Sequence, residues 1–246
     1  MDDETIKKRL NKFISESGIC SRRGADKLIK EGRVLVNGNL PELGVRVDRS
    51  DIITIDNKPI SNKESYIYLA FNKPVGITCT TEKQVKNNII DFINYPKRIY
   101  PIGRLDKPSE GLIFMTNHGD IINKILRAGN NHEKEYIVTV DKPITDDFIY
   151  RMGNGIPVLN TITKKCHVEK IDKYIFKIIL TQGLNRQIRR MCAHLSYKVT
   201  KLKRERIMNI SLGDIPVGKW RNITKSELKV IFELIANSDH TEKASL

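Results

Sequence analysis

Asp106 is the residue of this chain whose surroundings best fit a role in chemistry. It stands two residues after Arg104, in a segment that Gly103, Pro108 and Gly111 allow to turn sharply. A carboxylate in such a loop can act as a nucleophile or as a general base. The plainer interpretation is an aspartate that only stabilises a turn, and residue types alone favour it.

A group of basic residues is concentrated further along the chain. Between residues 183 and 206 there are eight Lys or Arg and one acidic residue, in a chain whose net charge is +14. Arg186, Arg189 and Arg190 recur at helical spacing opposite an apolar face, so a helix over residues 185–195 can bury that face and present its arginines to a site. Such clustering favours binding to a polyanion, most often nucleic acid, over a generic solvated surface.

The elements that must position these residues begin with a compact N-terminal set. The pattern predicts a short amphipathic helix over residues 5–18 and a second helix that is capped by Ser21 and ended by Gly32. Short strands follow, with Asn37-Gly38 as a tight turn between them. Helix, helix and short strands within about 60 residues indicate a small module.

This N-terminal pattern resembles the S4-like RNA-binding domain over about residues 5–60, because its apolar, glycine and Asn-Gly positions fall in register with that domain. The resemblance implies a binding module rather than a catalyst. Its second helix carries Arg22, Arg23 and Lys27, which would contact RNA phosphates. A solvated charged face is the alternative.

The rest of the chain is predicted to form one larger domain. We expect a first domain over residues 1–61, a polar linker over 62–65, a catalytic domain over 66–240 and a polar tail over 241–246. Strand patterns cover residues 66–71, 136–140 and 174–180, and helical patterns cover 120–126, 185–195 and 226–235. Because these elements do not alternate regularly, we expect an α+β fold with a mainly antiparallel mixed sheet flanked by helices.

Composition argues against several classes of protein. No apolar run approaches the roughly 20 residues that a membrane span needs, and the acidic start is unlike a secretory signal. The four cysteines lack a CxxC pair, and the five histidines lack metal-ligand spacing. We therefore expect a cytoplasmic protein without a metal centre.

Residues 103–119 resemble the Gly-Arg-Leu-Asp signature of the pseudouridine synthases of the RsuA type. Three further stretches look like motifs of this family: Asn72-Lys73-Pro74, Lys134-Glu135-Tyr136 and Gln187–Met191. The basic segment from Lys198 to Ile207 also follows the family pattern, and looks closest to members that act on large-subunit ribosomal RNA. With the module in front, the resemblance covers nearly the whole chain.

The resemblance implies an RNA pseudouridine synthase, an isomerase that needs no cofactor. Asp106 would act at the sugar of a flipped-out uridine, and its two chemical roles, nucleophile and base, both stay open. Arg189 would keep this carboxylate ionised. Tyr136 would stack on the uracil and also move a proton.

The same resemblance assigns binding roles around these three residues. Leu202 would form an apolar wall of the pocket, and Arg104 would contact a phosphate or fill the gap left by the flipped base. Arg186 and Arg190 would face RNA. Lys73 is assigned to substrate or RNA binding, with a place in the domain core as the alternative.

The expected substrate is a uridine of large-subunit (23S) ribosomal RNA, and the expected state is a monomer. A transfer RNA as second target stays open. One competing hypothesis is a non-catalytic RNA-binding or ribosome-assembly factor. A family member that had lost its activity should have lost Asp106, Arg189 or Tyr136 first, and this chain keeps all three. An RNA-cleaving hydrolase is a weaker competitor, because the chain shows neither paired carboxylates at metal-binding spacing nor a pair of histidines.

Overall fold

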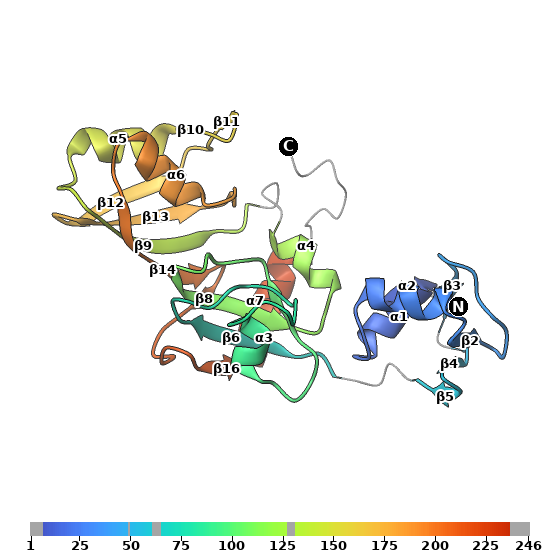
Figure 1. Ribbon diagram of the computed structural model, residues 1–246. Coiled ribbons are helices and arrows are strands. Elements are labelled where there is room, and N and C mark those ends of the chain that lie inside the picture. The colour runs from blue at the N-terminus through green and yellow to red at the C-terminus, as the bar shows by residue number, and fades with distance from the viewer. Residues whose placement is uncertain (1–6, 49, 61–64, 127–130, 237–246) are drawn as a thin grey trace. The chain divides into compact units, whose positions relative to one another are not determined.

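The computed structural model describes residues 7–48, 50–60, 65–126 and 131–236 (Figure 1). The expected linker falls mostly, and the expected tail entirely, outside the described residues. The chain divides into a small unit, made mainly of the residues before Ile67, and a large unit made mainly of the residues from Ile67 onward. Each unit has a hydrophobic core of its own.

The small unit packs two helices on short strands. Its elements are β1 (Lys8–Arg9), α1 (Leu10–Glu16), α2 (Arg22–Lys30), β2 (Val34–Val36), β3 (Arg46–Val47), β4 (Ile53–Ile55) and β5 (Lys58–Pro59). Strands β2, β4 and β5 form one antiparallel sheet, and β1 pairs with β3. The core between helices and strands contains Leu10, Ile14, Ile29 and Ile53.

The predicted end signals of α2 are confirmed. The Ser21 hydroxyl accepts a hydrogen bond from the backbone N–H of Gly24 at 3.0 Å, which caps the helix. Gly32 follows the helix with a φ of +68°, a conformation that glycine adopts without strain. Asn37 and Gly38 both have positive φ and form the expected tight turn.

The large unit is built on one mixed sheet. Its strands are β6 (Tyr68–Lys73), β7 (Tyr100–Ile102), β8 (Glu110–Thr116), β9 (Lys134–Val140), β12 (His167–Asp172), β13 (Ile175–Leu180), β14 (Val199–Ile207), β15 (Ile210–Ser211) and β16 (Trp220–Asn222). The order across the sheet is β12-β13-β9-β14-β8-β6-β16, with β7 paired to β8 and β15 to β14. Of these pairings only β14 with β8 is parallel. The predicted α+β class is confirmed.

Helices cover both faces of this sheet (Figure 1). They are α3 (Ile89–Ile93), α4 (Asp120–Leu126), α5 (Asp146–Asn154), α6 (Gln187–His194) and α7 (Lys225–Ala236), and a two-stranded hairpin of β10 (Pro157–Val158) and β11 (Thr161–Ile162) follows α5. Along β6 and β8 alternate residues enter two separate cores. Leu69 and Ile113 belong to the core that includes α5 and α6, whereas Ala70 and Leu112 belong to the core that includes α4 and α7.

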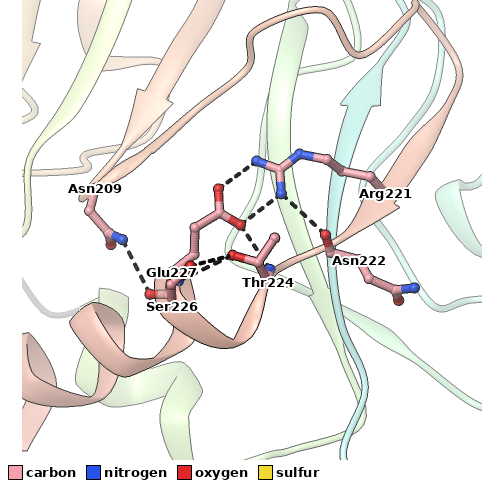
Figure 2. Close-up of polar contacts among 6 residues, drawn as sticks. All are labelled: Asn209, Arg221, Asn222, Thr224, Ser226 and Glu227. Atoms are coloured by element: carbon pink, nitrogen blue, oxygen red, sulfur yellow. Dashed lines mark hydrogen bonds and ion pairs between the residues drawn. The ribbon is translucent and has the colours of Figure 1, made fainter.

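Helix α7 begins with the expected capping box. The Thr224 N–H donates to Oε2 of Glu227 at 2.8 Å, and the Glu227 N–H donates to Oγ1 of Thr224 at 3.2 Å. Figure 2 shows that Arg221, on β16, also reaches this carboxylate with two nitrogens, each at 2.7 Å. These bonds from Arg221 are the main cause that lowers the pKa of Glu227 to about 2. The box therefore joins helix α7 to the edge of the sheet.

Several elements differ from the expectations. Helices α3 and α5 and strand β14 were not predicted, and the strand expected over residues 66–71 lies at Tyr68–Lys73. The helix expected over residues 185–195 begins only at Gln187, because Arg186 has a left-handed backbone with φ of +52°. In the part of the chain that is described, no helix is long and apolar enough to cross a membrane.

Candidate active site

A cleft of about 560 Å³ opens in the large unit. Its lining comes from the loop between β7 and β8, from β9, from the loop before α6, from α6 itself and from β14. The predicted residues that line it are Arg104, Asp106, Tyr136, Arg186, Arg189 and Leu202. These residues are up to about 100 positions apart in the chain, and the sheet brings them to one place.

Asp106 lies in the β7–β8 loop, at a tight turn in which the Ser109 N–H donates to the Asp106 carbonyl at 2.9 Å. Its carboxylate is about one-third exposed to solvent and faces two arginines. Oδ2 is 3.8 Å from Nε of Arg189 and 3.9 Å from Nη1 of Arg186. These distances are ion pairs rather than direct hydrogen bonds, so the carboxylate oxygens keep their lone pairs for a substrate.

Arg189 is fixed by three hydrogen bonds that do not involve Asp106. Its Nη1 donates to the Val199 carbonyl at 3.2 Å, and its Nη2 donates to the Pro108 carbonyl and to Oγ of Ser109, each at 3.0 Å. One side chain thus joins α6, the start of β14 and the loop that carries Asp106. Burial lowers the pKa of Arg189, yet a guanidinium remains charged in proteins.

The loop before α6 sets the position of Arg186. The Gln187 side chain is buried and accepts a hydrogen bond from the Leu184 N–H at 3.0 Å, which shapes this loop from inside. Arg190 holds the loop from outside, because its guanidinium donates to the carbonyl and to Oδ1 of Asn185. The three arginines therefore differ in role: Arg186 and Arg189 line the cleft and Arg190 does not.

Tyr136 and Leu202 form a second part of the cleft wall. They lie on the neighbouring strands β9 and β14, where Tyr136 pairs in register with Arg204. Leu202 is 5% exposed and Tyr136 is partly exposed, so an apolar side chain and an aromatic ring both line the cleft. A flipped base can stack on such a surface.

Sequence reasoning gave no site role to Lys134, Arg204 or Gln187, and all three line the cleft. Lys134 lies two residues before Tyr136, and Arg204 lies two residues after Leu202. Since side chains two apart in a strand share a face, the strand period could have placed both residues beside the predicted wall. The signal was missed because β14 was not recognised as a strand and because the strand predicted at β9 began only at Tyr136.

Lys73 lies in the core of the large unit, which was one of the two places that the sequence left open. Its side chain is fully buried, and its amine donates to the carbonyls of Pro74 at 2.8 Å and Ile77 at 2.9 Å. Burial lowers its pKa to about 8. In this arrangement Lys73 stabilises the turn after β6 and does not line the cleft.

The remaining predicted residues lie in loops and on the helix surface. Arg104 lines the cleft from the loop that carries Asp106. Arg22, Arg23 and Lys27 lie exposed on α2 of the small unit, where Lys27 is 3.6 Å from Glu31. Among the described residues, no three His, Cys, Asp or Glu side chains are grouped so that they could hold a metal ion.

Comparison with known proteins decides the family. Residues 67–194 match the model of the RNA pseudouridylate synthases, and residues 8–53 match the model of the S4 domain. The chain belongs to the RNA pseudouridylate synthase family. Its matched segment contains Asp106, Tyr136 and Arg189, and the S4 match contains α2 with its exposed basic residues.

Relatives in this family cover nearly the whole chain. The dual-specificity RNA pseudouridine synthase RluF of Escherichia coli O6:H1 is 58% identical over 96% of this chain and 82% of its own length. The ribosomal large subunit pseudouridine synthase B of Bacillus subtilis is 34% identical over 96% of this chain and 99% of its own. A crystal structure of a pseudouridylate synthase superposes with a TM-score of 0.68 at 29% identity, over 91% of this chain and 99% of that one. The chain is thus an RNA pseudouridine synthase, an isomerase that carries an RNA-binding S4 domain.

Proposed function

We propose that this synthase converts a uridine of large-subunit (23S) ribosomal RNA to pseudouridine, with Asp106 as the group that reacts at the sugar. The observation that carries the proposal is the environment of Asp106. Its carboxylate lines the cleft. Two arginines lie within 4 Å of it, but neither is close enough to form a hydrogen bond with it. Both candidate reactions require carboxylate oxygens that are free to attack carbon or to accept a proton, and neither arginine lies within hydrogen-bond distance of them.

The cleft suits a base that has left its stack. Extruding a nucleotide costs a few kcal/mol, and this cost is lowest in loops and bulges. Stacking on Tyr136 and contact with Leu202 offset part of it. Arg104 and Arg186 are the cations placed to contact the flanking phosphates, and the exposed basic residues of α2 add affinity that does not depend on sequence.

Two routes remain for the carboxylate. It can attack the anomeric carbon and form an ester, or it can remove the proton from C2′ and give a glycal. Deuterium at C2′ of the target uridine separates them, because only the second route breaks that bond. A slowed single-turnover rate supports proton removal, and an unchanged rate supports the covalent route.

The names of the relatives support ribosomal RNA as substrate. The Bacillus subtilis relative is named for the large subunit of the ribosome, whereas the Escherichia coli relative is named as dual in specificity. A second RNA target, for which transfer RNA is the candidate, therefore belongs to the proposal. A non-catalytic assembly factor has less support, because Asp106, Arg189 and Tyr136 line one cleft.

The test is a comparison of cells with and without the gene. Pseudouridine is mapped in 23S ribosomal RNA and in transfer RNA, and the deletion strain is complemented with the wild-type gene or with Asp106→Asn. We expect specific sites to be lost on deletion and restored only by the wild type. Asp106→Asn should still bind RNA, because the amide is nearly isosteric, but it lacks a useful nucleophile or base. Restoration by the Asn variant would remove Asp106 from this role.

A further inference from the structure

Arg204 is a buried cation that lines the cleft and has an unused donor. Its side chain is 4% exposed, and its Nε donates to the Leu112 carbonyl at 2.6 Å. Nη1 lies 3.5 Å from the Tyr136 hydroxyl. Nη2 is buried and has no hydrogen-bond partner among the described residues. An unsatisfied guanidinium nitrogen is costly to bury, and Arg204 lines the cleft, so a ligand bound in the cleft is a candidate partner for this donor.

Lys134 is a second buried cation on the same wall. It is 8% exposed, and of its three donors the described residues satisfy one, which bonds to the His132 carbonyl at 3.1 Å. Burial, followed by repulsion from Arg204, lowers its pKa to about 8. Within the described residues neither cation forms an ion pair with a carboxylate. The two cations therefore lie close enough to repel each other, in the same cleft wall as Tyr136, and neither has a paired carboxylate among the described residues.

The proposed reaction supplies an anion at this position. When the N1–C1′ bond breaks, both of its electrons go to the base, and the uracil leaves with a negative charge spread over N1, O2 and O4. C1′ is then held as the Asp106 ester or as the glycal. The base turns and C5 bonds to C1′, as the ester bond to Asp106 breaks or, on the glycal route, as the proton that Asp106 took returns to C2′. The proton on C5 is then released and N1 is protonated, so no atom is gained or lost. The anion exists only between the two bond changes.

We propose that Arg204 and Lys134 bind and stabilise the uracil anion during this turn. The inference rests on the proposed function of Asp106. Donors placed where charge develops accelerate a reaction more than they tighten substrate binding. A ribose phosphate is a poorer occupant for the pair, because both cations are buried beside the aromatic platform, whereas Arg104 lies in a loop at the cleft.

The first test uses Lys134→Met, which keeps length and removes the charge. We expect the single-turnover rate at saturating RNA to fall by about 10²–10³-fold, the typical effect of one lost oxyanion donor, while RNA affinity changes little. Lys134→Arg should recover part of the rate. The matched control is Lys170→Met. Lys170 also donates to a backbone carbonyl, that of Ile144, but it does not line the cleft, and its variant should keep the wild-type rate.

The second test changes the leaving group. A fluorine at C5 stabilises the uracil anion, so RNA with 5-fluorouridine at the target should depend less on the two cations. We expect Lys134→Met and Arg204→Lys to lose less rate on this RNA than on the uridine RNA, measured as single-turnover consumption of the target nucleoside. Thermal unfolding identifies a variant that has lost its fold. If Arg204→Lys does not fold, the Lys134 variants decide the test alone.

The outcomes separate this inference from the function beneath it. A wild-type rate for Lys134→Met, an equal loss on both RNAs, or a loss confined to RNA affinity would each overturn the anion role. Absence of pseudouridine with the wild-type enzyme, or its formation by Asp106→Asn, would instead overturn the proposed function.

Discussion

Asp106 and Tyr136 both line the cleft, and each has a cation as a polar neighbour. For Asp106 these are Arg186 and Arg189 at nearly 4 Å, and for Tyr136 it is Arg204, whose guanidinium lies 3.5 Å from the hydroxyl and 5.9 Å from the ring centre. The cations set the charge around the two groups to which we assign the chemistry, without blocking them. This arrangement is typical of a site organised in advance for a charged intermediate.

Tyr136→Phe separates the ring from its hydroxyl. The ring remains, and because we expect it to stack on the uracil, RNA affinity should stay close to that of the wild type. If the hydroxyl moves a proton, as we expect, single-turnover rate should fall by about 10²–10⁴-fold. Rates and affinities measured on the same RNA check this. A wild-type rate would leave Tyr136 only the role of a platform.

Lys73 should make stability depend on pH in a specific direction. Its pKa is about 8 in the folded protein against an ordinary value of 10.5, so between these two pH values the unfolded chain binds more protons. Stability therefore rises with pH in this window, by about 1–3 kcal/mol for a shift of this size. Lys73→Met should reduce the rise without abolishing it, because burial also lowers the pKa of Lys134 to about 8.

Denaturant unfolding between pH 7.5 and 9 measures that slope, a window set by the pKa of about 8 for Lys73. The window stops at about pH 9 because burial raises the pKa of Cys79, which acts in the opposite direction at higher pH. Lys170→Met serves as the control, since Lys170 is exposed. A slope in Lys73→Met equal to that of the wild type would show that the folded protein does not shift this lysine.

At the level of elements, the pairing of β8 with β14 holds the site together. Strand β8 begins four residues after Asp106, and β14 carries Leu202 and Arg204. The two strands approach closely at Gly111, which has a φ of +107° and which pairs with Arg204. A Cβ at this position would collide with the Arg204 backbone.

Gly111→Ala should therefore destabilise the large unit by more than about 2 kcal/mol. The positive φ is strained for alanine, and the added Cβ collides with the Arg204 backbone. Activity should fall together with stability. A side chain at this position pushes β14, which carries Arg204, away from β8, which follows Asp106. Gly183→Ala is the control for stability. A Cβ added at Gly183 would meet no atom within 4 Å, and its φ is not positive, so this variant should change unfolding free energy by less than about 1 kcal/mol. Equal midpoints for the two variants would contradict the account.

The elements also show where prediction from the sequence stops. Helices α2, α4 and α7 were predicted because their apolar periods and end signals are local. Strand β14 was not, because Arg204 is a buried cation at a position where the strand period expects an apolar residue. The contact of Arg190 with Asn185 was missed for a different reason: it depends on a left-handed residue at the start of α6, which no local pattern predicts.

For the whole molecule, the net charge of +14 makes RNA binding sensitive to salt. Replacing Arg22, Arg23 and Lys27 with Gln should weaken binding, and each lost phosphate contact should flatten the slope of log affinity against log salt by about 0.7–0.9. Single-turnover rate at saturating RNA should change far less, because none of the three lines the cleft.

A second triple variant controls for the lost net charge. Arg151, Lys170 and Lys173 are exposed on α5, on β12 and in the turn that follows β12, away from the cleft lining. Their replacement with Gln should leave most of the slope in place. If the slope is unchanged in the α2 variant, that helix face does not touch RNA.

The pairing of β6 with β16 bears on how the enzyme is made. Leu69 lies opposite Asn222, so these two neighbouring strands are separated by about 150 residues of chain. Contacts between such distant segments slow folding. The entropy of closing the long loop between them is lost before the contacts can stabilise the sheet. On the ribosome, Asp106 emerges long before β14 and β16 can join its sheet. The nascent chain therefore contains Asp106 well before the strands that complete the cleft and its sheet. We expect activity only after the last of these strands has been synthesised.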